Sequence, residues 1–146
     1  MPRLVVAAAF SGLLFLGSAQ FGGGGGQEAP NLCDRPLPPL SPGAVGKRDF
    51  DMAHDGMERV IGMANQGDIA SARNAFFLRV HDFTHNVDGP LRAKDDGLAK
   101  ALCRAVAQIE VEFLSSTPRE AATIAEHAEG IRDLLRQAAA ALGFEW

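Results

Sequence analysis

Apolar side chains recur every three or four residues through most of the chain after residue 46, and this spacing constrains the fold more than any other feature. Such a repeat places the apolar side chains on one face of an α-helix, whereas a half-buried strand needs strict alternation. Glycine and proline interrupt the pattern, which predicts four helices at residues 47–66, 69–87, 95–115 and 118–142. Four amphipathic helices with short connections are typical of an all-α, antiparallel up-and-down four-helix bundle, here at residues 47–143.

The ends of these helices carry signals of their own. Gly67 ends the first helix and Asp68 caps the second, whose end is predicted at Asp88-Gly89-Pro90. The segment Thr117-Pro118-Arg119-Glu120 has the order of an N-cap, a first helical residue and a capping-box partner. Gly143 closes the last helix.

Residues 1–19 have the pattern of a secretory signal peptide. Arg3 precedes 14 uncharged, mostly apolar residues at 4–17, and small side chains at 17–19 favour cleavage before Gln20. The alternative is an uncleaved membrane anchor, but 14 helical residues span only about 21 Å of the roughly 30 Å hydrocarbon core. We therefore expect a periplasmic or secreted protein with no membrane span in the mature chain.

Residues 20–46 have the composition of a linker. They combine a run of five glycines at 22–26 with five prolines between residues 30 and 42. Glycine is flexible and proline is extended, so we expect a disordered tether between the signal peptide and the bundle.

The two cysteines, Cys33 and Cys103, suit a single disulfide in an exported chain. Cys103 lies at the flank of the apolar stripe of its helix, where the incoming tether can reach it. The bond would close a loop of about 70 residues and contribute about 2–4 kcal/mol. Two free thiols are the alternative, and no Cys-x-x-Cys pair indicates a redox motif or covalent haem attachment.

Charge and motifs exclude several function classes. The formal net charge is −4 with no basic stripe, which argues against nucleic acid as a partner. No phosphate-binding loop, nucleotide fingerprint or Ser-His-Asp arrangement is present. Glu110 and Glu112 are two residues apart, so they face different neighbours and do not suggest acid–base chemistry. No nucleophile–base pair can be named, so the sequence favours a non-catalytic role over an enzyme.

The four histidines carry the candidate chemistry. His81 and His85 are four residues apart, so they share one face of a helix. They do not form the His-Glu-x-x-His pattern of zinc proteases, because Asp82 stands where glutamate would be. His54, His81 and His127 lie in or beside the apolar stripes of three different helices, and we expect them to converge between those helices.

Such a cluster suits a transition metal, because imidazole is a ligand for iron, copper, nickel and zinc. We rank iron and copper above zinc, and the expected ligands are His54, His81, His85, His127 and Asp88. Non-covalent haem ranks lower, with His54 or His127 as the axial ligand. The alternative is a structural or protein-interaction module in which the histidines hold no ligand.

Part of the sequence has a familiar order of residues. Residues 72–77 read Ala-Arg-Asn-Ala-Phe-Phe, residues 81–95 read His-Asp-Phe-Thr-His-Asn-Val-Asp-Gly-Pro-Leu-Arg-Ala-Lys-Asp, and residues 109–113 read Ile-Glu-Val-Glu-Phe. This stretch resembles the extracytoplasmic helical domain that precedes the membrane part of some bacterial high-affinity iron permeases. Asp88-Gly89 and Arg92-Ala93-Lys94 match that family's Asp-Gly-Val-Arg-Ala-Lys-Ser segment, whereas Val87 replaces a glutamate.

The resemblance implies a periplasmic helical module linked to iron or copper uptake, with a membrane metal-transport protein as a partner. It transfers no ligand residue to this chain. We therefore expect an exported helical bundle that binds a transition metal without catalysing a reaction.

Overall fold

The computed structural model describes residues 32–115 and 120–146. Within these ranges the chain forms five α-helices, one short 3₁₀ helix and no strand, which confirms the all-α prediction. In chain order they are η1 Leu32–Asp34, α1 Lys47–Asn65, α2 Ile69–Arg79, α3 His81–Arg92, α4 Asp96–Leu114 and α5 Ala121–Leu142. The expected signal peptide and residues 20–31 of the expected tether lie outside the described residues.

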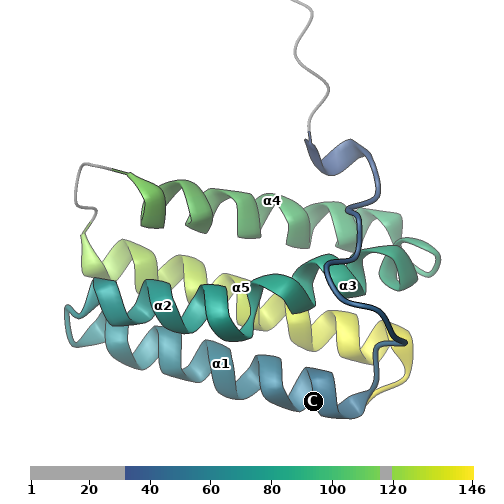
Figure 1. Ribbon diagram of the computed structural model, residues 1–146, viewed down its shortest axis with the longest axis horizontal. Helices are drawn as coiled ribbons and strands as arrows, with labels where there is room; N and C mark the ends of the chain where they lie inside the picture. The colour runs from purple at the N-terminus through teal and green to yellow at the C-terminus, as the bar shows by residue number, and fades with distance from the viewer. Residues whose placement is uncertain (1–31, 116–119) are drawn as a thin grey trace, which may run out of the picture.

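The helices lie side by side in one bundle-like body. Figure 1 shows α1, α4 and α5 running alongside one another, with α2 and α3 placed end to end as a further row. Helix α1 packs against α2 and α5, and α4 packs against α3 and α5. No helix in the two described ranges is long and apolar enough to cross a membrane.

The helix predicted at residues 69–87 is divided in the structure, because α2 ends at Arg79 and α3 begins at His81, with Val80 between them. Val80 is fully buried against α1, where a Cβ added to Gly56 would stand 2.8 Å from Val80 Cγ2. The Thr84 hydroxyl also donates to the His81 carbonyl oxygen at 2.7 Å, and such bonds to the preceding turn tend to bend helices. This close packing on α1 therefore sets the position of His81 as the first residue of α3.

The predicted end of that helix at Asp88-Gly89-Pro90 is also wrong, because α3 continues to Arg92. Proline lacks an N–H and usually breaks a helix interior. Here Val87, Asp88 and Leu91 are buried, so packing holds the extra turn together. Pro90 is exposed, which lets water solvate the backbone groups that it leaves unpaired.

The structure confirms two of the predicted end residues, and it moves the start of the last helix. The carboxylate of Asp68 caps α2 by accepting a hydrogen bond from the Ser71 backbone N–H at 3.0 Å. Gly143 closes α5 in the left-handed conformation with φ of 81°. Helix α5 begins at Ala121 with Glu120 as its N-cap, later than the expected residue 118, and residues 117–119 lie outside the described ranges.

The inward faces of all five helices form one apolar core. Many of its members are alanines, which let the helices approach closely. Its larger fully buried side chains are Phe50, Met57, Val60, Phe76, Leu91, Ile109, Ile124, Ile131 and Leu135.

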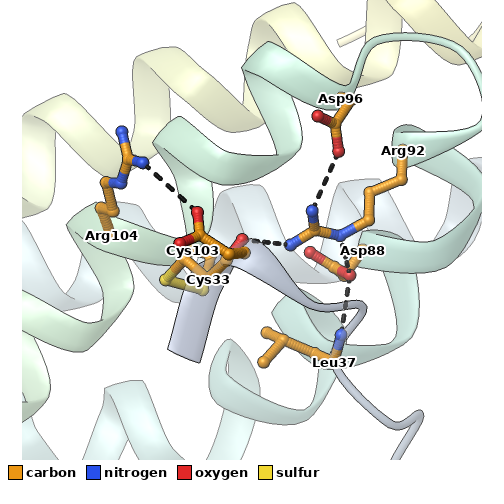
Figure 2. Close-up of a disulfide and its surroundings, with 8 residues drawn as sticks. Cys33, Leu37, Asp88, Arg92, Asp96, Cys103 and Arg104 are labelled. Carbon is orange, nitrogen blue, oxygen red and sulfur yellow. Dashed lines mark hydrogen bonds and ion pairs between the residues drawn. A yellow bond between two sulfur atoms is a disulfide. The ribbon is translucent and has the colours of Figure 1, made fainter. Parts of the chain in front are cut away.

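Residues 32–46, which we call the strap, pack on the helices instead of forming the structureless tether expected there. Cys33 is joined to Cys103 of α4 with a Cα–Cα distance of 5.6 Å, as predicted (Figure 2). Leu37 is buried beside the two cysteines. Two backbone N–H groups of the strap also donate to the Asn86 side-chain oxygen at 2.9 and 3.1 Å. Composition alone missed this order because the acceptors lie on α3, far away in sequence.

Candidate functional site

His81 and His85 lie next to each other on α3, as their spacing predicts, with ring centroids 4.8 Å apart. The Nδ1 atom of His81 is 3.1 Å from Asp82 Oδ1. The Nδ1 atom of His85 is 3.2 Å from the carbonyl oxygen of Pro38 in the strap. A carbonyl oxygen only accepts, so in the neutral His85 ring Nδ1 carries the proton and Nε2 keeps its lone pair.

Glu110 of α4 reaches His81 from the neighbouring helix. Its Oε1 atom lies 3.2 Å from His81 Nε2, and the two side chains are 26% and 23% exposed. Glu110 Oε1 is itself buried and accepts no hydrogen bond from the described part of the chain. A buried carboxylate oxygen therefore faces an imidazole nitrogen at the edge of the α3–α4 contact.

His54 has neighbours of a different kind. It lies on α1, with its ring edge-on to Trp146 at a centroid distance of 5.1 Å. Its Nδ1 and Nε2 atoms are 3.5 Å from Asp55 Oδ1 and 3.9 Å from Glu58 Oε1, and its side chain is 42% exposed. His54 thus belongs to the packing of the C-terminal residues onto α1.

His127 of α5 pairs with a buried carboxylate. Its Nδ1 atom is 2.8 Å from Glu112 Oε1, and the Glu112 side chain is only 3% exposed. Its Nε2 atom lies 3.2 Å from the side-chain nitrogen of Gln108. Both ring nitrogens therefore have partners on α4, and the pair fastens α5 to α4.

Asp88, one of the predicted ligands, is engaged in contacts that join the strap to α3. Its Oδ2 atom accepts a hydrogen bond from Arg92 Nε at 2.8 Å and another from the Leu37 backbone N–H at 2.9 Å. Arg92 also donates to Asp96 and to the carbonyl oxygen of Cys33 (Figure 2). The hydrogen bond with Asp88 raises the pKa of the Arg92 guanidinium above its ordinary value. This ion pair therefore joins the strap to α3.

The expected convergence of His54, His81 and His127 is not observed. Each ring has the separate set of partners given above. Over residues 32–115 and 120–146, no group of three or more His, Cys, Asp and Glu side chains is arranged to hold a metal ion. Of the predicted ligands, the structure brings together only His81 and His85.

Comparison with known proteins adds no assignment, since no family model, curated protein or solved structure matches the chain.

A cavity of about 430 Å³ lies where the strap, the start of α1 and the α2–α3 junction meet. Its lining includes Leu78 and Met52, whose side chains are 83% and 51% exposed. Asp82, the neighbour of His81, also lines it. The cavity and the histidine pair therefore lie near the same end of α3.

Two functional candidates escaped the sequence analysis, namely Glu110 and Glu112. Their spacing correctly indicates different neighbours, but it does not say which ones. The available signal was the presence of two acids within the otherwise apolar stretch 109–113. Only the packing of α4 between α3 and α5 assigns Glu110 to His81 and Glu112 to His127.

Proposed function

We propose that this protein is an exported, non-catalytic helical module that binds a transition metal through His81 and His85. One observation carries the proposal: two imidazoles lie side by side on α3, with centroids 4.8 Å apart. Imidazole is a suitable ligand for iron, copper and zinc. The contact of His85 Nδ1 with the Pro38 carbonyl oxygen leaves the lone pair of the neutral ring on Nε2, and partners of this kind set the tautomer of metal-binding histidines.

Two observations support export. The first 19 residues have the pattern of a signal peptide. The disulfide between Cys33 and Cys103 suits an oxidising compartment such as the periplasm or the exterior. Because both cysteines are engaged in this bond, neither supplies a thiol nucleophile, which favours binding over catalysis.

The scaffold in this proposal is an antiparallel up-and-down four-helix bundle in which α2 and α3 together form the second arm. The connections from α1 to α2 and from α3 to α4 lie at opposite ends of the helices (Figure 1), which supports this topology. The residue order at 72–113 adds the expectation of a role in metal uptake beside a membrane transport protein.

The test measures metal binding by the purified, disulfide-bonded protein, produced without a polyhistidine tag. We expect about one equivalent of Cu²⁺, Fe²⁺ or Zn²⁺ after desalting, measured by elemental analysis. At a free metal concentration one hundred times the Kd, binding adds about 2.7 kcal/mol to the free energy of unfolding and raises Tm.

Two histidine variants give the control. His85→Asn keeps an N–H donor for the strap but removes the metal donor, so it should lose the metal. His54→Asn should retain it, because His54 lies on another helix. Absence of bound metal in the unaltered protein, or equal loss in both variants, would contradict the proposal.

The second candidate is a protein-interaction module without a ligand, and the cavity at the α2–α3 junction favours it. Leu78 and Met52 expose apolar surface there, which suits an apolar side chain of a partner. This candidate predicts that the unaltered protein retains no metal and that Leu78→Ser abolishes partner binding.

A further inference from the structure

The contact between His81 and Glu110 poses an electrostatic problem. Both ring nitrogens of His81 lie beside carboxylate oxygens, with Nδ1 3.1 Å from Asp82 Oδ1 and Nε2 3.2 Å from Glu110 Oε1. A neutral imidazole carries a single proton, so at one of these two contacts a nitrogen lone pair faces a carboxylate oxygen, and Glu110 Oε1 is the buried oxygen that accepts no hydrogen bond within the described residues. Two such atoms repel each other unless a positive charge, either a proton or a metal ion, lies at the contact.

The separation suits a metal ion. Zinc-like ions bind imidazole nitrogen and carboxylate oxygen at about 2.1 Å. Two donors 3.2 Å apart then subtend an angle of about 100° at the metal. That angle falls between those of octahedral and tetrahedral coordination, so both donors can bind one ion without movement of the backbone.

His85 provides a third donor from the next turn of α3. Its Nε2 atom makes no hydrogen bond or ion pair within the described residues, and its ring lies 4.8 Å from that of His81. These three side chains are not arranged as a metal site in the structure, so the His85 side chain must leave its contact with Pro38 and rotate to direct this nitrogen at the same point. The remaining coordination positions are then open to water or to a donor from a partner.

We infer that Glu110 is the third ligand, and that His81, His85 and Glu110 form a two-histidine, one-carboxylate site. This inference rests on the proposed function. Asp82 orients the His81 imidazole from behind, which is the usual arrangement around metal-bound histidine. Two nitrogen donors and one oxygen donor favour a divalent first-row ion such as Fe²⁺, Zn²⁺ or Co²⁺ over Cu⁺, which prefers sulfur.

The test uses Co²⁺ as a spectroscopic probe of the disulfide-bonded protein. Its d–d absorption reports the ligands and the coordination number, and titration gives the Kd. Glu110→Gln should weaken Co²⁺ binding by at least about tenfold and change the absorption spectrum. Glu126→Gln, an exposed substitution on α5, is the matched control and should bind like the unaltered protein.

The outcomes separate this inference from the proposed function. If Glu110→Gln binds Co²⁺ with unchanged Kd and spectrum while His85→Asn does not bind, Glu110 is only an ion-pair partner of protonated His81, and the histidine pair stands alone. If the unaltered protein binds neither Co²⁺ nor Zn²⁺ nor Fe²⁺, both proposals fail. Weakened Co²⁺ binding with an altered spectrum in Glu110→Gln, together with unchanged binding in Glu126→Gln, supports the three-ligand site.

Discussion

Gly56 and Gly62 lie on the same helix, and the structure predicts different effects on stability when each is replaced by alanine. A Cβ at Gly56 would stand 2.8 Å from Val80 Cγ2 and 3.1 Å from Arg79 Cβ, at the break between α2 and α3. A Cβ at Gly62 would meet nothing within 4 Å. The two substitutions therefore share their backbone effect and differ in the packing.

The magnitudes follow from two opposing contributions. Replacing glycine by alanine in a helix interior stabilises by about 1 kcal/mol, and this gain applies to both variants. Overpacking costs about 1–3 kcal/mol, and only Gly56→Ala incurs it, because the β-branched Val80 has few alternative rotamers. The gain cancels in the comparison, so the free energy of unfolding of Gly56→Ala should lie about 1–3 kcal/mol below that of Gly62→Ala.

Urea unfolding followed by circular dichroism at 222 nm measures this difference. Gly130→Ala on α5 is a second control, because a Cβ there also meets nothing within 4 Å. If Gly56→Ala proves as stable as Gly62→Ala, then α1 does not approach the α2–α3 break as closely as the structure shows. The account of where α3 begins would then be wrong.

Three further predictions concern the strap and the caps. Replacing Cys33 and Cys103 together by alanine should lower the free energy of unfolding by about 4 kcal/mol in urea titrations, since the bond closes a loop with a sequence separation of 70 residues. A loss below about 1 kcal/mol would mean that the strap detaches before the helices unfold. Asp88→Ala should lower the free energy of unfolding by about 3–5 kcal/mol, because it leaves the largely buried Arg92 without its closest carboxylate. Hydrogen exchange at the strap amides should become faster, and an unchanged exchange rate would contradict this role of the ion pair. Hydrogen bonds from Ser71 lower the pKa of Asp68 below its ordinary value of 3.8. The contribution of this carboxylate to stability is therefore present above that pH and is lost as the pH falls through the lower folded-state pKa. Asp68→Asn should make acid unfolding less steep in that range, and an identical acid titration would refute the cap.

Local sequence rules predicted the helical character of the chain and several helix ends. The 3–4 spacing of apolar residues identifies the helices, because a helix buries one face whatever packs against it. Asp68 and Gly143 were identified correctly as a cap and a stop, since those functions depend only on neighbouring backbone groups. The disulfide was predicted from cysteine number and compartment, which require no knowledge of the fold.

The features that sequence spacing did not predict depend on contacts between distant segments. The break at Val80 depends on the absent side chain of Gly56, and α3 passes through Pro90 because burial of Leu91 outweighs a lost hydrogen bond. The strap is ordered by acceptors on α3 and by Cys103, none of which its own composition reveals.

The same distinction holds for the candidate site. The chain order alone placed His81 and His85 on one helical face, because the pitch of the α-helix brings positions i and i+4 together. It could not say that His54 meets Trp146, that His127 meets Glu112, or that Glu110 turns its oxygen towards His81. Those pairings depend on how each helix is rotated and placed against its neighbours, and only the packed tertiary structure fixes that rotation.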